Sequence, residues 1–205
     1  MSRLSGLYAI TDNHLSSADR LIQAVSEAIS GGARIIQYRD KSDDQARRLH
    51  EARQLLQLCR EHHVTLIIND DITLAATIGA DGVHLGRDDA NIESARQQLP
   101  EGIIGISCYN DWQQAQAATQ AGADYIAFGA FFPSTTKPDA AQAEPSLLKR
   151  VKQELNIAVV AIGGITAENG APLIAAGADM LAVVQGVFGQ TDIRQAARQY
   201  AQLFN

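Results

Sequence analysis

The sequence predicts an α/β fold, a single-domain (β/α)8 TIM barrel that spans residues 1–205. Three observations predict it. Short β-branched runs alternate with longer stretches of helical periodicity. Several short runs, such as Ala158–Ile162, are apolar on both faces, which is typical of parallel strands covered by helices. Gly-Ala or Gly-Ala-Asp recurs before every second run, as four (βα)2 units would require. Each of eight units would have about 26 residues, which is short but sufficient for this barrel.

The expected strands follow in chain order: Leu7–Ile10, Arg34–Tyr38, Thr65–Asn69, Gly82–Leu85, Ile103–Ser107, Tyr125–Phe128, Ala158–Ile162 and Leu181–Val184. The clearest helical stretches between them are Ala18–Ser30, Asp44–His63, Asp111–Ala121 and Ala167–Ala176. The recurring glycines stand where a helix would end in a residue with positive φ: Gly32, Gly79, Gly122 and Gly177. Their irregular spacing favours a barrel over a solenoid. No linker or low-complexity segment divides the chain, so we expect one domain.

Composition narrows the class of partner. The 23 acidic residues outnumber the 17 basic ones, and the net charge of −6 argues against a nucleic-acid or anionic membrane surface. No run approaches the roughly 18 apolar residues of a membrane helix, and the first residues lack the apolar core of a signal peptide. Cys59 and Cys108 fit neither a metal site nor a disulfide framework, so we expect a cytoplasmic protein. A homo-oligomer is compatible with this composition.

A row of polar and cationic side chains follows the second expected strand. Gln37, Arg39 and Lys41 are spaced by two residues, so they share one face of an extended chain. That face cannot point at the helices without burying charge. We therefore expect the row to point into the barrel and up to its carboxyl-terminal mouth, where barrel active sites lie. The alternative is that Arg39 and Lys41 are surface charges paired with acidic residues of the same loop.

Two carboxylates follow consecutive strands. Asp70 comes directly after Thr65–Asn69, and Asp89 comes shortly after Gly82–Leu85. Neighbouring parallel strands lie about 4.8 Å apart, so the two side chains could share one divalent cation. Carboxylate oxygens suit Mg²⁺, which often binds through one or two carboxylates and the phosphates of a substrate. The alternative is that aspartates here cap the helices that follow, Asp70 or Asp71 the one and Asp89 the other.

Two further segments suit an anion. The loop after the sixth strand contains hydroxyl groups beside one ammonium group, in Ser134, Thr135, Thr136 and Lys137. Its alternative is a solvated turn. Backbone N–H groups can approach an anion at Gly164, after the seventh strand, and at Val184 and Gln185, where the eighth strand ends. Loops after the last two strands are the usual phosphate site of these barrels.

The remaining candidate residues carry no charge and are expected at the barrel mouth or in the barrel core. Ser107 and Cys108 end the fifth strand, and no adjacent histidine or carboxylate could activate either one, so we expect no covalent nucleophile. His84 alternates with apolar neighbours and is expected to be a hydrogen-bonded histidine of the barrel core. Three cations, one divalent metal and two carboxylates sum to about +3, which would balance a diphosphate of about −3. A diphosphate beside a second phosphate subsite favours a transfer reaction in which pyrophosphate leaves.

These motifs resemble the thiamine-phosphate synthase family over nearly the whole chain. The matching segments are GLYAITD, GGARIIQYRDK, IINDD, GADGVHLGRDD, IGIS, GADYIAFGAFFPSTTKPD, AIGGIT and GADMLAVV. The resemblance implies a (β/α)8 barrel and a Mg²⁺-dependent transferase. Such an enzyme joins 4-amino-2-methyl-5-hydroxymethylpyrimidine diphosphate to 4-methyl-5-(2-phosphooxyethyl)thiazole and forms thiamine monophosphate and pyrophosphate. The implied substitution is dissociative, with pyrophosphate leaving before the thiazole nitrogen attacks.

The resemblance also implies a role for each matched residue. The pyrimidine diphosphate would be bound by Gln37, Arg39, Lys41, Asn69, Ser107 and Lys137. The Mg²⁺ ligands would be Asp70 and Asp89. The thiazole phosphate would be bound by Ser134, Thr136, Gly164, Val184 and Gln185, and Thr135 of the same loop is placed with them. Catalysis would rest on electrostatic stabilisation of the leaving group, with Arg39, Ser107 and Lys137 as the expected catalytic residues.

Three departures from the family pattern stand out. Gln185 occupies a position where a small serine is common, so a backbone contact to phosphate is expected there. Cys108 and Tyr109 replace a small residue and a histidine, and the loop after Lys137 lacks a glycine before the next helix. Two other functions stay open. One is a thiazole tautomerase of the same superfamily, although such relatives lose the diphosphate residues present here. The other is a non-catalytic regulator that binds the thiamine precursors.

Overall fold

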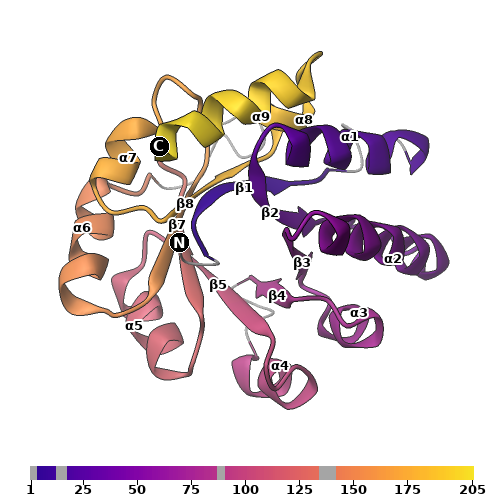
Figure 1. Cartoon of the computed structure of the whole chain (residues 1–205). Coiled ribbons are helices and arrows are strands. Elements are labelled where there is room, and N and C mark those ends of the chain that lie inside the picture. Colours follow the sequence, from indigo (N-terminus) through magenta and orange to yellow (C-terminus); the bar gives the residue numbers. More distant parts are fainter. Residues whose placement is uncertain (1–3, 13–17, 87–90, 134–141) are drawn as a thin grey trace.

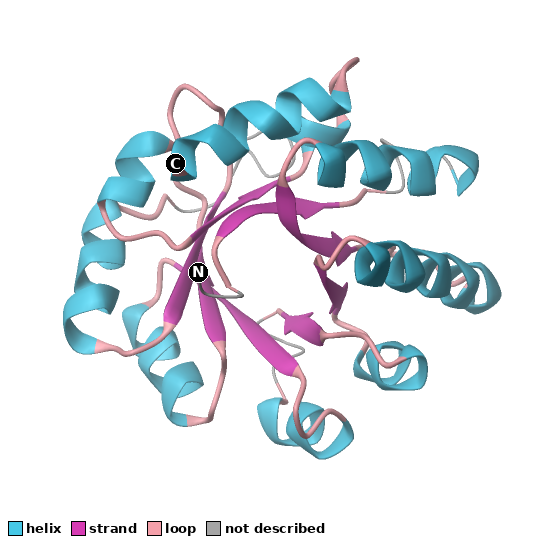
Figure 2. Cartoon of the chain, in the orientation of Figure 1, coloured by secondary structure: helices cyan, strands magenta, loops and turns pink. Residues whose placement is uncertain are grey.

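Eight parallel strands close into one barrel, in which each strand pairs with the next along the chain and β8 pairs with β1. The computed structural model describes residues 4–12, 18–86, 91–133 and 142–205. Figure 1 shows the helices arranged around the outside of the strands, and Figure 2 shows the same two layers by type. The predicted (β/α)8 barrel is therefore confirmed.

All eight expected strands are present, and their bounds differ from the prediction by at most two residues. They are β1 (Gly6–Ile10), β2 (Ala33–Tyr38), β3 (Thr65–Asn69), β4 (Gly82–Leu85), β5 (Ile103–Tyr109), β6 (Tyr125–Phe128), β7 (Ala158–Ile162) and β8 (Met180–Val183). Val184, which was expected in the last strand, lies just beyond it as the N-cap of the following helix.

The described helices are α1 (Ala18–Ser30), α2 (Gln45–Glu61), α3 (Ile72–Ile78), α4 (Ile92–Gln98), α5 (Trp112–Gln120), α6 (Pro145–Glu154), α7 (Ala171–Ala175), α8 (Gln185–Phe188) and α9 (Ile193–Ala201). A 3₁₀ turn, η1 (Gln202–Phe204), follows α9. None of these helices is both long and apolar enough to cross a membrane.

The predicted start of the seventh helix at Ala167 is wrong, because α7 begins at Ala171. Two reciprocal hydrogen bonds close a turn before it: Thr166 N–H donates to Asn169 Oδ1 at 2.8 Å, and Asn169 N–H donates to Thr166 Oγ1 at 3.3 Å. Pro172 then stands in the first turn of the helix, where its missing N–H costs nothing. The apolar periodicity of this stretch thus begins before the helix itself does.

The core has two apolar layers that follow from strand alternation. Along β2, Ile35 belongs to a cluster in the barrel interior, whereas Ile36 belongs to the larger cluster between strands and helices. Gln37 continues the interior face and Tyr38 the outer face. This alternation decides which side chains of the mouth reach the interior and which reach the helix layer.

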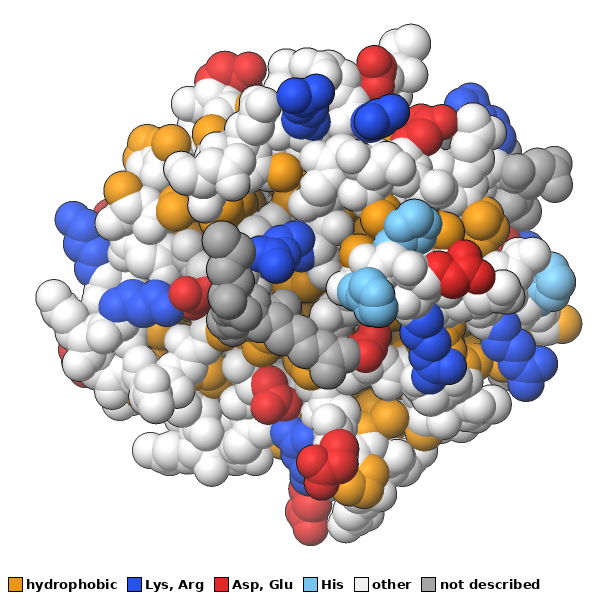
Figure 3. Space-filling view, viewed as in Figure 1, with side chains coloured by type: hydrophobic (Ala, Val, Ile, Leu, Met, Phe, Trp, Pro, Cys, Tyr) orange, Lys and Arg blue, Asp and Glu red, His pale blue; other side chains and the backbone are white. Residues whose placement is uncertain are grey.

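Aspartates at the amino-terminal ends of the strands fix the register of three strand pairs. In each pair the carboxylate accepts the N–H of a residue in the preceding strand, at 2.8 Å: Asp81 from Leu66, Asp124 from Ile104 and Asp179 from Val159. The glycines before these strands all have positive φ, as predicted. Figure 3 looks onto this end of the barrel, where basic and acidic side chains are interspersed.

Candidate active site

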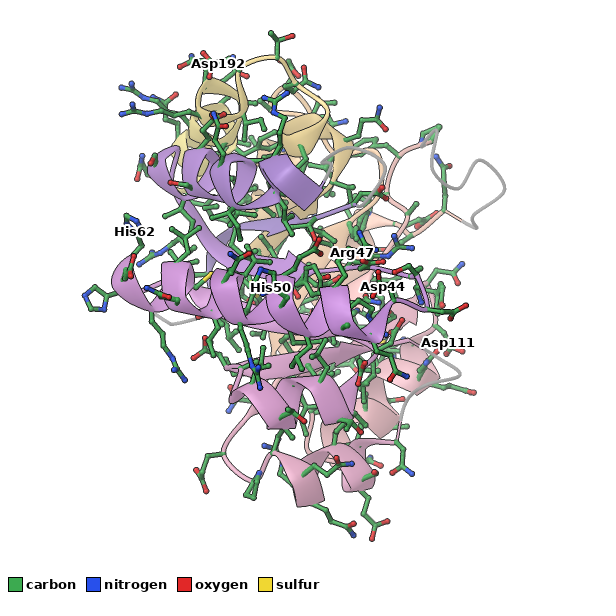
Figure 4. All side chains as sticks on the ribbon, turned by 90° about the vertical axis from the view of Figure 1, so that its right-hand side faces the viewer. Asp44, Arg47, His50, His62, Asp111 and Asp192 are labelled. Carbon is green, nitrogen blue, oxygen red and sulfur yellow. The ribbon has the colours of Figure 1, made fainter. Side chains whose placement is uncertain are left out.

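The sequence-predicted residues that the structure describes lie at the carboxyl-terminal ends of the strands. Figure 4 shows this end on one side, with Asp44 and Asp111 at the starts of their helices, and His62 at the opposite end of α2. The described candidates are Gln37, Arg39, Lys41, Asn69, Asp70, Ser107, Gly164, Val184 and Gln185. The others lie outside the described residues: Asp89, Ser134, Thr135, Thr136 and Lys137.

One oxygen of Asp70 collects two donors at the tip of β3. Lys41 Nζ donates to Asp70 Oδ2 at 2.5 Å, and Asn69 Nδ2 donates to the same oxygen at 2.7 Å. Asp70 has a φ of 60°, in the left-handed region, and its N–H donates to the carbonyl of His84 at 2.8 Å. The β3–β4 pairing thus holds the carboxylate in place, and an ammonium group from the β2–α2 loop lies against it.

Of the two aspartates that could cap the next helix, Asp71 is the N-cap and Asp70 is not. Asp71 Oδ1 accepts the N–H of Leu74 at 2.8 Å, and its other oxygen accepts Arg48 Nη2 at 2.7 Å. Lys41 likewise pairs with Asp70 and not with the acidic residues of its own loop. The carboxylate of Asp70 therefore takes no part in capping α3.

Oδ1 of Asp70 accepts no hydrogen bond from any described residue, so it is open to a cation. The side chain of Asp70 is 23% exposed, which leaves room for a ligand at this oxygen. Among the described residues no group of three or more His, Cys, Asp or Glu side chains could hold a metal ion. One carboxylate oxygen beside an amide still fits Mg²⁺, which commonly retains waters and takes its remaining ligands from substrate phosphates.

Arg39 leans towards the end of β1. Its N–H donates to Thr11 Oγ1 at 3.0 Å, and its Nη1 lies 3.5 Å from Asp12 Oδ2. The side chain of Arg39 is 32% exposed. The interior row predicted from the period of two thus divides, since Gln37 stays inside while Arg39 and Lys41 reach the rim on either side of it.

A buried ionic network holds the β2–α2 loop from the helix side. Asp40 accepts Ser42 N–H at 2.8 Å and Arg47 Nη2 at 2.6 Å. Tyr38 OH donates to Glu51 Oε2 at 2.6 Å. Burial by itself would raise the pKa of Asp40, but the hydrogen bonds from Ser42 and the nearby Arg47 charge hold it below its ordinary value. The loop that carries Arg39 and Lys41 is therefore fixed between them, at Asp40.

Gln37 opens a polar chain in the barrel interior that the sequence reasoning missed. Gln37 Nε2 donates to Tyr8 OH at 2.7 Å, and Tyr8 OH lies 2.8 Å from Tyr125 OH. His84 Nδ1 lies 2.9 Å from Tyr125 OH, and His84 Nε2 lies 2.9 Å from Ser107 Oγ. Two predicted substrate residues, Gln37 and Ser107, are therefore joined across the barrel.

The register of β4 and β5 explains the pairing of His84 with Ser107. In the β4–β5 register His84 pairs with Gly105, and Ser107 lies two residues further along the same face. Neighbours in sequence alone do not predict this contact. Gly105 is needed as well, since a Cβ there would lie 1.9 Å from Cζ of Tyr125. The glycine makes room for the tyrosine ring that reaches His84.

Burial sets the protonation of this chain. It lowers the pKa of His84 to about 4, so the imidazole is neutral near pH 7. It raises the pKa of Tyr8 and of Tyr125, so both phenols keep their protons. The chain therefore consists of neutral donors and acceptors, and the charges of the site stay at the rim.

The ends of β7 and β8 lie side by side where the second phosphate was expected. Ile162 pairs with Ala182, so Gly164 and Val184 come equally far beyond the paired residues. Gly163 and Gly164 have φ values of 99° and 62°, and a Cβ on Gly164 would lie 2.5 Å from the carbonyl oxygen of Pro133. These glycines thus let the chain before residue 134 pack closely. The side chain of Gln185 is exposed at the start of α8.

Comparisons with known proteins agree on one family. A family model described as "Thiamine monophosphate synthase" matches residues 7–187. The thiamine-phosphate synthase of Nitrosococcus oceani is 54% identical over 204 residues, covering 99% of this chain and 94% of the relative. That of Thiobacillus denitrificans is 52% identical over 200 residues, covering 97% and 94%. The solved structure of thiamine phosphate pyrophosphorylase from Pyrococcus furiosus superposes with a TM-score of 0.90 at 35% identity, covering 98% of this chain and 96% of that one.

Proposed function

The chain belongs to the thiamine monophosphate synthase family, and from that premise we propose how it performs the synthase reaction. The enzyme is a transferase that joins 4-amino-2-methyl-5-hydroxymethylpyrimidine diphosphate to 4-methyl-5-(2-phosphooxyethyl)thiazole. The products are thiamine monophosphate and pyrophosphate. The observation that carries this reading in the structure is the meeting of Lys41, Asn69 and Asp70 at one carboxylate oxygen, with the other oxygen open.

That arrangement suits a diphosphate accompanied by a cation. An ammonium group at the tip of β3 can neutralise phosphate, and the open oxygen of Asp70 can hold a divalent ion beside it. We propose that Asp70 and Asp89 hold Mg²⁺, which when bound supplies positive charge to the leaving pyrophosphate. Arg39 and Lys41 bind the same diphosphate from the β2–α2 loop, and Lys137 is proposed to bind it from the segment after β6.

In this reaction these residues stabilise developing charge and are not required to transfer protons. In a dissociative substitution the bond between the pyrimidine methylene carbon and the diphosphate oxygen breaks first, and its electron pair leaves with pyrophosphate. The thiazole nitrogen then donates its lone pair to the resulting carbocation. Arg39, Ser107 and Lys137 act in the first step, because their attraction to pyrophosphate grows as its negative charge grows.

The thiazole phosphate is proposed to bind where β7 and β8 end. Gly164 and Val184 lie at equivalent depth on these neighbouring strands, and Gln185 begins α8. Because the Gln185 side chain is exposed, its contact is assigned to the backbone N–H. Three hydroxyl residues of the loop after β6 complete this subsite: Ser134, Thr135 and Thr136.

The partners are small-molecule substrates, and we propose no role for nucleic acid or a membrane. The cytoplasm is the proposed compartment, since Cys59 and Cys108 form no disulfide with each other. A homo-oligomer stays a proposal, to be settled by measuring the mass of the native protein in solution.

A direct assay tests the proposed reaction. The purified protein is supplied with both phosphorylated precursors and Mg²⁺, and thiamine monophosphate and pyrophosphate are measured together. We expect equal amounts of the two products and none when either precursor is left out. Isomerisation of the thiazole ring without coupling would indicate the tautomerase instead. Binding of precursors without any turnover would indicate the regulator.

A further inference from the structure

A continuous chain of hydrogen bonds crosses the barrel interior and ends at a predicted substrate residue. In order, the chain contains Gln37, Tyr8, Tyr125, His84 and Ser107, from four different strands besides that of Gln37, with four contacts of 2.7 to 2.9 Å. Gln37, Tyr8 and Tyr125 are each at most 3% exposed. Water therefore competes little for these bonds, and each can polarise the next.

The first bond of the chain sets the direction of the others. The amide Nε2 of Gln37 can only donate, so the oxygen of Tyr8 accepts that hydrogen bond. The hydroxyl of Tyr8 can then donate its own hydrogen bond to the oxygen of Tyr125. In the opposite direction Tyr8 would accept from both neighbours, and its own proton would find no acceptor among the described residues. The buried phenol therefore favours donation from Tyr8 to Tyr125.

The same direction continues to the mouth. The hydroxyl of Tyr125 donates a hydrogen bond to Nδ1 of His84, so Nδ1 is the unprotonated nitrogen of the neutral imidazole. The proton is therefore on Nε2, which donates a hydrogen bond to Ser107 Oγ. The hydroxyl proton of Ser107 then has no acceptor among the other members of this chain of hydrogen bonds. We propose that this chain presents the Ser107 hydroxyl as a fixed hydrogen-bond donor to the pyrimidine diphosphate, with Tyr8, Tyr125 and His84 as positioning residues. The proposal rests on the proposed synthase function for the identity of the acceptor.

Packing holds the chain in this geometry. The rings of His84 and Tyr125 are stacked, with centroids 5.6 Å apart and an interplanar angle of 17°. The rings of Tyr8 and Tyr125 meet edge to face at 6.0 Å. Gly105 leaves the space that the Tyr125 ring fills. A donor fixed in advance needs no reorientation when charge develops on the leaving group, so it lowers the barrier more than it strengthens ground-state binding.

The His84 tautomer tests the direction without any substrate. Protein labelled with ¹⁵N-histidine is studied near pH 7 by long-range ¹H–¹⁵N correlation, and the His84 signals are identified by their loss in His84→Gln. We expect protonated Nε2 and unprotonated Nδ1 in the free protein. A tautomer with the proton on Nδ1 would reverse the chain and overturn the proposal, whatever reaction the protein catalyses.

The kinetic test uses Tyr125→Phe, which removes the donor to Nδ1 and keeps the ring. We expect kcat to fall roughly tenfold or more, with KM for the pyrimidine diphosphate nearly unchanged. Tyr200→Phe is the matched control, because it also removes a buried phenol bond, to the Ile165 carbonyl, but outside the chain. Its kcat loss should be much smaller than that of Tyr125→Phe.

A double variant separates positioning from a structural effect. Ser107→Ala should lose at least as much kcat as Tyr125→Phe. If Tyr125 acts only through Ser107, adding Tyr125→Phe to Ser107→Ala should cause little further loss. Additive losses, or unchanged kcat in a folded Tyr125→Phe protein, would overturn the proposal. If no variant, nor the unaltered protein, forms thiamine monophosphate, the proposed function fails and the tautomer result still decides the direction of the chain.

Discussion

Asp70 and Asp71 are neighbours in the chain, but their carboxylates have different partners. The left-handed backbone at Asp70 turns its side chain towards Lys41 and Asn69 at the barrel mouth. Asp71 instead caps α3 and pairs with Arg48 of α2. Of these two consecutive aspartates, Asp70 is thus available to a ligand, while Asp71 caps the helix.

This division predicts effects of very different size for two matched variants. Asp70→Asn removes the charge that would hold Mg²⁺, and we expect kcat/KM to fall by about a hundredfold or more. Asp71→Asn removes the same charge one residue away and keeps a good N-cap, so kcat/KM should change only a fewfold. Steady-state kinetics with both precursors gives the comparison. Equal losses in the two variants would remove Asp70 from its proposed role.

His84 predicts how stability depends on pH. Its pKa is about 4 in the folded protein, because of burial, and about 6.5 when unfolded. Between these values the unfolded chain binds a proton that the folded protein does not, so the free energy of unfolding falls as pH falls. One such group contributes up to about 1.4 kcal/mol per pH unit. Denaturant unfolding at pH 7 and pH 5 should show a smaller drop in His84→Gln than in the unaltered protein, and an equal drop would contradict the assignment.

At the scale of elements, the β2–α2 loop is held by bonds to the helix that follows it. Arg47 of α2 reaches back to Asp40, between the two predicted phosphate-binding residues of the loop. It also donates to Ser42 at 2.7 Å. The position of Arg39 and Lys41 therefore depends on a helix side chain that is not itself one of the predicted ligand residues.

Arg47→Met should weaken both the fold and the substrate site. It leaves the buried carboxylate of Asp40 without its charged partner, and we expect the free energy of unfolding to fall by about 2 kcal/mol. KM for the pyrimidine diphosphate should rise severalfold because the loop is less fixed. Arg53→Met, an exposed position on the same helix, is the control and should change stability by less than about 0.5 kcal/mol. A variant that loses stability at unchanged KM would show that the network serves the fold alone.

The strands could be predicted from sequence because a covered parallel strand has a simple signal, a short apolar run on both faces. Strand order alone then brought Lys41 and Asp70 to the same rim. The start of α7 could not be read from apolar period, because a side-chain turn at Thr166 competes with the helix. The link from His84 to Ser107 depends on strand register, which sequence adjacency does not reveal.

At the scale of the whole molecule, the two ends of the barrel have different tasks. The carboxyl-terminal ends of the strands carry the predicted ligand residues, while the amino-terminal ends carry the aspartates that fix strand register. Asp124 accepts Ile104 N–H and also pairs with Arg96 at 2.9 Å. Stability and catalysis should therefore be separable by position along the barrel axis.

Asp124→Ala tests this separation. It leaves the Ile104 N–H without its acceptor, and we expect a loss of about 1–2 kcal/mol in the free energy of unfolding. The kcat and KM values should stay unchanged at a temperature where the variant is folded. Glu154→Ala breaks an exposed ion pair with Arg150 and should cost less than about 1 kcal/mol. A fall in kcat in folded Asp124→Ala would show that the two ends are coupled.

Calorimetric titration with inorganic pyrophosphate, with and without Mg²⁺, tests most directly whether the barrel mouth holds a diphosphate and a cation together. We expect the unaltered protein to bind pyrophosphate much more tightly when Mg²⁺ is present. Asp70→Asn should lose most of that enhancement, and Asp71→Asn should keep it. Pyrophosphate binding that ignores Mg²⁺, or an enhancement that survives in Asp70→Asn, would contradict the shared site at the tip of β3.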